Sequence, residues 1–209
     1  MGTGSRTLRG AAGPGSRVWR ADGGIKAGMK KMSVFLILTL AFPAQSFLVQ
    51  AQTEKAPATL KSILLEQLRK THNQKDWFVP ANTAVEGLTP EQASWKDGSG
   101  NHSVGQLTAH LVFWNQDQLA RFKGEPPPKY SGKNDDTFVF DSKKWNAAVQ
   151  QLDEVLTAWE KAVEAADDKK IESWASTIAL IGTHNAYHVG QIIYVRKQQG
   201  SWDPEKGVK

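Results

Sequence analysis

The chain has 209 residues, no cysteine and a formal net charge of +5. The absence of cysteine excludes disulfide bonds and a lipid anchor attached through a cysteine. The positive charge is concentrated before Gln52, where seven of the 26 basic but only one of the 21 acidic residues lie. The remaining 158 residues carry 19 basic and 20 acidic side chains, a charge of −1, which argues against nucleic-acid binding.

The first 51 residues have the layout of a targeting segment. From Met29, two lysines precede a short apolar run over residues 33–42, and small residues near Ala51 match the preference of a signal peptidase. We therefore expect a signal peptide over residues 29–51, with cleavage after Ala51 and a periplasmic or secreted product. Residues 1–28 show hardly any periodicity, and we interpret them as an extension created by a misassigned start codon. An unusually long basic region before the apolar run is the alternative.

The apolar run is too short for a membrane span, which needs about 20 apolar residues. We therefore expect no stable membrane anchor after cleavage. Residues 52–58 would form a short linker, residues 59–202 one helical domain, and residues 203–209 a C-terminal tail. The length remaining after cleavage is enough for a single domain with a proper core.

Hydrophobic periodicity predicts helices joined by turn-rich loops, with no convincing strand pattern. The first helix is expected over residues 59–73. Its buried face is predicted to consist of Leu60, Ile63, Leu64 and Leu68. A short piece is expected over residues 82–88, and Thr89 followed by Pro90 is typical of the start of another helical turn.

The second main helix is expected over residues 102–122, with Ser103 as its N-cap. The proline triplet at 126–128 then predicts a stiff, extended crossover to about Asp136, which is either a connector or a lid over a substrate. Asp141 is expected to cap a third helix that ends at Ala166. Its predicted core side chains are Trp145, Val149, Leu152, Leu156 and Trp159.

The fourth helix is expected to follow a polar turn at 167–170 and to end at Gln199, with Gly200 closing it. Four long helices with one long crossover predict an all-α four-helix bundle.

Two histidines on the fourth predicted helix form the strongest chemical motif. His184 and His188 are four residues apart, so their Cβ atoms lie roughly 5–6 Å apart on one helix face. The apolar stripe that turns them toward the core is Ile178, Ile181, Ile192 and Val195. The pair could hold one divalent metal ion, or both rings could simply be hydrogen-bonded in the core. No glutamate follows His184, so the motif of zinc proteases is absent.

A third ligand is expected from another helix. His110 lies at the edge of the buried stripe of the second helix and is the candidate. His102 precedes the N-cap of that helix, and His72 sits in a polar run over residues 70–75. We expect both of these histidines on the wetted surface and outside a metal site.

Two segments together resemble the DinB/YfiT-like family of metalloenzymes. They are Ser-Val-Gly-Gln-Leu-Thr-Ala-His-Leu-Val-Phe-Trp-Asn at 103–115 and His-Asn-Ala-Tyr-His-Val-Gly-Gln-Ile-Ile at 184–193. The resemblance spans most of the chain after about Thr59. It implies a four-helix bundle in which His110, His184 and His188 bind a divalent metal. Zinc is expected first, with nickel and iron as alternatives, because imidazole suits all three.

Three histidines leave a coordination position for water or substrate. The resemblance implies a thiol-dependent transferase or isomerase that uses a low-molecular-weight thiol with a small-molecule substrate, and a homodimer is common among relatives. Such thiols are chiefly cytosolic, which conflicts with the predicted export, so a hydrolase or a loss of catalysis is the alternative. A non-catalytic, stress-related binding protein with structural histidines is the second hypothesis.

No catalytic residue follows from the sequence. Residues near the predicted metal that could support it are Asn115, Asn185, Tyr187, Gln191 and Arg196. For each of them a purely structural role is the simpler interpretation.

Overall fold

The computed structural model describes residues 57–208, so the predicted signal peptide and the extension before it lie outside the described part. Residues 57–208 form helices and contain no β-strand. The long helices are α1 (Leu60–His72), α4 (Val104–Lys123), α5 (Trp145–Ala165) and α6 (Asp168–Gln198), and the short ones are α2 (Ala81–Val85) and α3 (Pro90–Ser94). Within this range, no helix combines the length and hydrophobicity that crossing a membrane requires.

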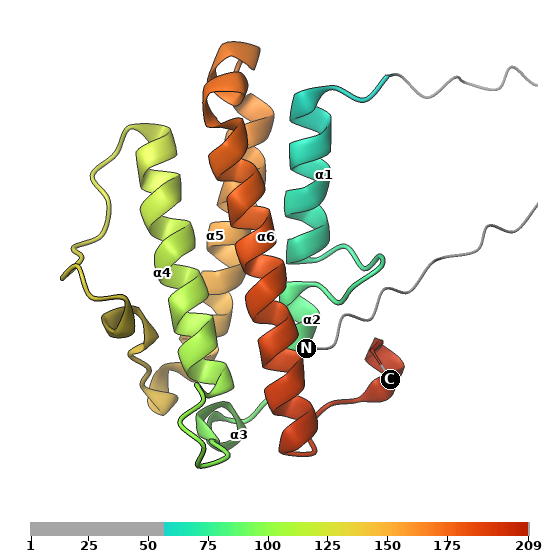
Figure 1. The fold of residues 1–209 in the computed structure, drawn as a ribbon, viewed down its shortest axis with the longest axis vertical. Helices are drawn as coiled ribbons and strands as arrows, with labels where there is room; N and C mark the ends of the chain where they lie inside the picture. Colours follow the sequence, from blue (N-terminus) through green and yellow to red (C-terminus); the bar gives the residue numbers. More distant parts are fainter. Residues whose placement is uncertain (1–56, 209) are drawn as a thin grey trace, which may run out of the picture. The chain divides into compact units, whose positions relative to one another are not determined.

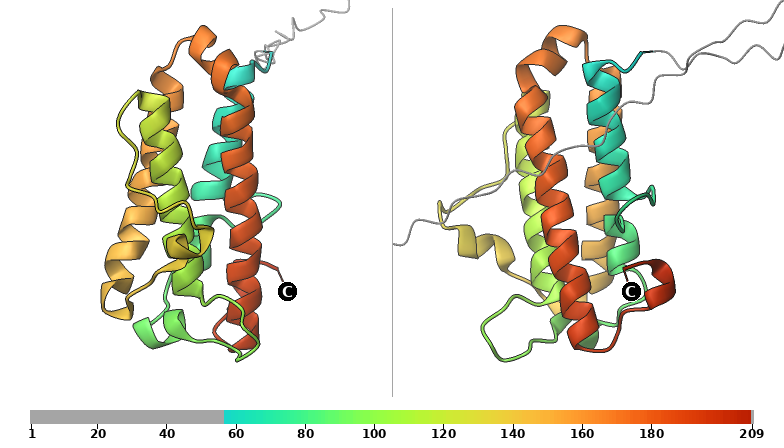
Figure 2. Two further views of the ribbon diagram at one scale, coloured as in Figure 1. Left: turned by 60° about the vertical axis from the view of Figure 1, so that its left-hand side comes forward. Right: turned by 45° about the vertical axis from the view of Figure 1, so that its right-hand side comes forward.

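The four long helices form a bundle (Figures 1 and 2). Packing contacts join α1 to α5, α5 to α4, α4 to α6 and α6 to α1, so the helices surround the core in that order. One long crossover, residues 124–144, connects α4 to α5 and contains two 3-10 turns, η1 (Asn134–Phe138) and η2 (Ser142–Lys144). The predicted all-α four-helix bundle is confirmed, and it makes α4 and α6, which carry the three candidate histidines, direct neighbours.

The core side chains of α5 are largely those that the sequence predicts. Trp145, Leu152, Leu156 and Trp159 are buried, and Val149 is half-buried. Both tryptophans satisfy their indole N–H groups, since Trp145 donates to the carbonyl of Leu88 and Trp159 to that of Asn115.

The prediction for α1 is wrong at two positions. Leu60 and Ile63 are 44% and 43% exposed, whereas Leu65 is buried. The reason is that α1 packs against both α5 and α6, and it does so with the side chains of residues 64, 65 and 68 and of the two residues at its C-terminal end.

The helix starts follow ordinary capping chemistry. Thr59 and Ser103 cap α1 and α4, and each forms a reciprocal capping box with the third helical residue. Thr89 caps α3 with Pro90 at its first position, as predicted. Asp167 caps α6 directly, so residues 168–170 form the first turn of that helix and not a separate polar turn.

The crossover lies closely against α4. Asp141 caps η2, one turn before α5, and not α5 itself. A Cβ atom placed on Gly105 of α4 would lie 2.2 Å from the ring of Phe140, so the glycine is what permits this approach. The close contact brings residues 137 and 138 of the crossover to the side of α4 that carries His110.

Candidate metal centre

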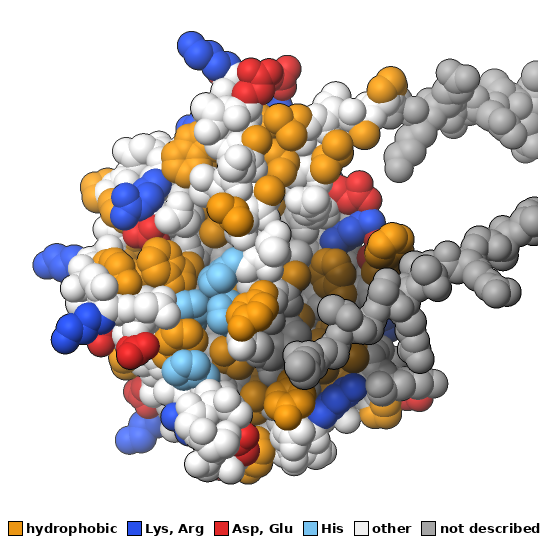
Figure 3. Space-filling model, in the orientation of Figure 1, with side chains coloured by type: hydrophobic (Ala, Val, Ile, Leu, Met, Phe, Trp, Pro, Cys, Tyr) orange, Lys and Arg blue, Asp and Glu red, His pale blue; other side chains and the backbone are white. Residues whose placement is uncertain are grey.

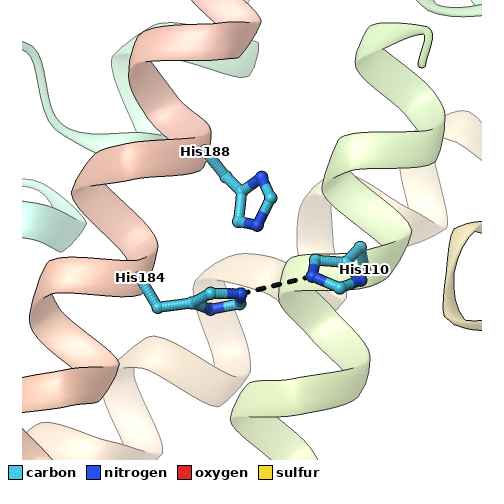
Figure 4. A group of neighbouring side chains, drawn as sticks. All are labelled: His110, His184 and His188. Carbon is cyan, nitrogen blue, oxygen red and sulfur yellow. Dashed lines mark hydrogen bonds between the residues drawn. The ribbon is translucent and has the colours of Figure 1, made fainter. Parts of the chain in front are cut away.

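Three histidines from two helices converge at the interface between α4 and α6. His110 comes from α4, while His184 and His188 occupy successive turns of α6 (Figure 4). One ring nitrogen from each residue lies within 4.8 Å of the others, a spacing that could hold a metal ion. His110 and His188 are buried and His184 is half-buried. The structure therefore brings together all three histidines that the sequence selects.

The crossover fixes the ring of His110. Its Nδ1 lies 2.5 Å from the hydroxyl of Thr137, and that hydroxyl donates its single hydrogen to the carbonyl of Asn134 at 2.6 Å. The hydroxyl must therefore accept from Nδ1–H, which leaves the lone pair on Nε2 directed at the other histidines. Phe138 stacks on the same ring, with centroids 4.0 Å apart and planes 9° from parallel.

The next turn of α6 fixes the ring of His188. Its Nδ1 lies 2.6 Å from the side-chain oxygen of Gln191, which can only accept, so Nδ1 carries the proton. The amide nitrogen of Gln191 donates to the hydroxyl of Tyr187 at 3.2 Å, which is consistent with this orientation of the amide. His188 thus also presents an unprotonated Nε2.

The position of the proton on the third ring, that of His184, follows from its contact with His110. Nε2 of His184 lies 3.2 Å from Nε2 of His110. Because the nitrogen of His110 has a free lone pair, His184 donates from Nε2 in this arrangement. Binding a cation between the two rings would require the proton of His184 to move to its Nδ1.

Burial keeps all three rings neutral at ordinary pH. It lowers the pKa of His110 to about 3, with His188, His184 and His102 contributing further. It lowers the pKa of His184 to about 4, with a smaller contribution from His188. The pKa of His188 is also lowered by burial, and the hydrogen bond to Gln191 opposes this change. Neutral imidazole is the form that binds a metal.

A groove of about 610 Å³ opens beside the cluster, and His110 and His184 line it. The remaining lining residues, which define the apolar groove, are Trp114, Gln118, Asn134, Thr177, Leu180 and Ile181. Figure 3 shows histidine side chains at the molecular surface with hydrophobic side chains around them. The histidine cluster can therefore be reached from solvent.

The residues predicted near the metal divide into two groups. Gln191 and Tyr187 do support the cluster, as described above. Asn115 and Asn185 instead pair with each other, since the amide of Asn115 donates to the side-chain oxygen of Asn185 at 2.8 Å. Arg196 lies elsewhere and donates to backbone carbonyls, among them that of Ala84 at 2.6 Å, so its role is structural.

The predictions for the other two histidines need correction. His72 is 1% exposed, with Nδ1 lying 2.6 Å from Glu160 and Nε2 lying 2.8 Å from Asp153. Both carboxylates come from α5, which covers the end of α1. His102 is half-buried, because its ring stacks on Phe138 at 3.8 Å. Neither residue is a freely solvated surface histidine, and neither belongs to the cluster.

Thr137 and Phe138 are the supporting residues that sequence reasoning misses. They lie in the crossover, where no helical period relates them to His110. Their distance of 27 residues or more from His110 gives no local signal, and only the return of the crossover onto α4 brings them together.

The donor set fits a divalent transition metal. Three neutral imidazoles converge, and the outer N–H groups of His110 and His188 are bonded to oxygen atoms, the usual environment of metal-binding histidines. Zinc, nickel and iron all accept such ligands.

The sequence signature described as the DinB superfamily matches residues 81–192. This range is more than half of the chain and contains all three histidines of the cluster. The chain therefore belongs to the DinB superfamily, which confirms the predicted resemblance. No curated protein and no solved structure gives a significant match.

Proposed function

We propose that this protein binds one divalent metal ion through His110, His184 and His188 and uses the site to activate a small molecule. The observation that carries the proposal is the convergence of three ring nitrogens within 4.8 Å, with two of the rings held by acceptors on their far side. Three protein ligands leave a coordination position for water or substrate.

When bound, a divalent ion would supply Lewis acidity and lower the pKa of a water or thiol beside it. The chain's own contribution is orientation and shielding. Thr137 and Gln191 hold two imidazoles with Nε2 inward, while Phe138 covers one face of His110. These contacts fix the ligands before any ion arrives, which reduces the ordering needed on binding.

A thiol-dependent transfer suits the groove better than a hydrolysis that needs a separate base. The residues that line the apolar groove include no aspartate, glutamate or lysine. A general base would have to lie within hydrogen-bond reach of the attacking water. A thiol needs less help, because its ordinary pKa of about 8.5 is already close to neutrality. We therefore place the thiol-dependent transferase first and the hydrolase second.

The test of the metal site is elemental mass spectrometry of protein purified without a histidine tag or added metal. We expect one ion per chain in the wild type and a sharp loss in each of His110→Ala, His184→Ala and His188→Ala. His72→Gln is the matched control, because it changes a buried histidine outside the cluster and should keep its metal. A wild-type protein that is metal-free and takes up neither zinc, nickel nor iron on titration would make the histidines structural and the protein a non-catalytic binding protein.

The choice between transferase and hydrolase needs a second measurement. We expect the cobalt-substituted protein to develop a sulfur-to-cobalt charge-transfer band when 2-mercaptoethanol is added. Methanol at the same concentration is the control and should give no such band. A cobalt protein whose spectrum does not change when the thiol is added would favour the hydrolase.

We also propose that the mature protein is periplasmic or secreted. The basic start at Met29, the apolar run and the small residues before Gln52 support this proposal. Expression of the full chain in a bacterium, followed by cell fractionation and N-terminal sequencing, tests it. A mature protein that begins at Gln52 outside the cytoplasm is expected, and an intact N-terminus in the cytoplasm would refute export.

A further inference from the structure

We propose that the apolar groove beside His110 and His184 binds an uncharged, largely apolar organic molecule with an aromatic ring. That this molecule is a substrate rests on the proposed function, but its binding does not require the metal. The inference follows from the groove's size, from the chemistry of its walls and from the fixed position of one aromatic side chain.

The walls of the groove offer no partner for an ionic ligand. Trp114, Leu180 and Ile181 supply apolar surface, while the other side chains supply uncharged amides, a hydroxyl and the two imidazoles. Away from the metal position, a charged group on the ligand would lose hydration without gaining an ion pair, which is costly. A volume of about 610 Å³ falls in the range of small-molecule pockets.

The aromatic wall is held in place before any ligand binds. Trp114 makes edge contacts with Phe113 at 5.3 Å and with Tyr130 of the crossover at 5.4 Å, measured between ring centroids. It also lies edge-on to His110 at 6.4 Å. Three ring contacts fix the indole beside the cluster, and a fixed aromatic surface binds a flat ring at little cost in conformational entropy.

Leu180 marks the outer edge of the groove. Its side chain is 67% exposed although it is large and apolar. A ligand that covers it would remove apolar surface from water and so gain affinity. Tyr194 lies two heptads further along α6 and is 57% exposed, but it does not line the groove. The two residues therefore form a matched pair for mutation.

A second cavity nearby differs in character and position. It has about 480 Å³, and Lys96, Asp97 and Gln191 are among its lining residues. Its link to the cluster is Gln191, whose side-chain oxygen accepts the hydrogen bond from Nδ1 of His188. A ligand there would face the side of His188 that points away from the other two histidines. The apolar groove, which two cluster histidines line, is therefore the approach to the reactive centre.

The experiment compares two fluorescent probes that share the same rings. N-phenyl-1-naphthylamine is uncharged, and 8-anilino-1-naphthalenesulfonate carries one added sulfonate. We expect the full wild-type protein to bind the uncharged probe saturably and at least tenfold more tightly than the sulfonate. Leu180→Glu should weaken binding of the uncharged probe at least tenfold, whereas Tyr194→Glu should leave it unchanged. Equal binding of both probes, or an unchanged affinity in Leu180→Glu, would overturn the inference.

A metal-depleted His188→Ala variant separates this inference from the proposed function, because His188 does not line the groove. We expect this variant to bind the uncharged probe as the wild type does. Probe binding by a wild-type protein that holds no metal would leave the groove assignment standing and remove the metal function. A wild-type protein that holds its metal but does not bind the probe would overturn the groove assignment and leave the metal function standing.

Discussion

The hydroxyl of Thr137 lies 2.5 Å from Nδ1 of His110 and accepts its proton in a hydrogen bond. A residue of the crossover thereby sets which nitrogen of a histidine on α4 is free to bind a metal. The crossover therefore does more than connect α4 with α5, because it supplies part of the support of the candidate metal centre.

Removing this hydroxyl should weaken metal binding. Thr137→Val keeps the shape of the side chain but leaves Nδ1–H of His110 without its acceptor. We expect zinc affinity to fall about 10–100-fold, the usual effect of losing such a support. Thr137→Ser keeps the hydroxyl and should stay close to the wild type. Competition with a chromophoric zinc chelator measures both, and equal affinities for valine and serine variants would show that the hydroxyl does not set the tautomer.

The contact between Gly105 and Phe140 should be intolerant of a methyl group. Gly105→Ala would place a Cβ atom 2.2 Å from the ring, so Phe140 and the crossover must shift. We expect a loss of about 1–3 kcal/mol in the free energy of unfolding, typical of overpacking. Gly190→Ala is the control, because a Cβ atom added there would meet nothing within 4 Å, and it should be neutral or stabilising by up to about 1 kcal/mol. Urea denaturation of the two variants gives the comparison.

The buried amide pair between α4 and α6 should contribute to stability without touching the metal. In Asn185→Leu, the amide of Asn115 loses its partner on α6. We expect a destabilisation of about 1–3 kcal/mol from the unsatisfied group. Replacing both residues by leucine should cost less than the sum of the single changes, because no amide is then left unpaired. A strictly additive double mutant would argue against direct coupling of the two side chains.

The metal-free protein should lose stability in acid through its histidine cluster. The folded pKa values of His110 and His184, about 3 and about 4, lie below the ordinary value of 6.5. Between 6.5 and about 4 the unfolded chain takes up protons that the folded chain does not, so stability is complete above pH 6.5 and falls as the pH is lowered. Urea midpoints measured across this range should show the decrease. His184→Gln should make it shallower, and an unchanged slope in that variant would mean that other groups cause it.

The sequence predicts the four helices and the inward face of the two histidines on α6 because both depend on local periodicity, whereas the full set of three ligands follows from the resemblance to the DinB/YfiT-like family. The stripe of isoleucines on α6 predicts that His184 and His188 face the core, and in the structure His188 is buried and His184 half-buried. His72 shows the limit of this reasoning, since its neighbours in sequence are polar and exposed. The carboxylates that bury it, Asp153 and Glu160, are 81 and 88 residues away. The hydrogen bond from His110 to Thr137 cannot be predicted from the sequence either, because it depends on how an irregular crossover packs back against α4.

The position of the cluster between α4 and α6 has a mechanical consequence for a chain that contains no cysteine. Nε2 of His110 and Nε2 of His184 lie 3.2 Å apart although 74 positions separate the two residues along the chain. A cation held between them would close a large loop and act as a reversible cross-link, the part that a disulfide plays in many exported proteins. A chelator would remove this cross-link, and the stability of the folded protein would then depend on the supply of metal.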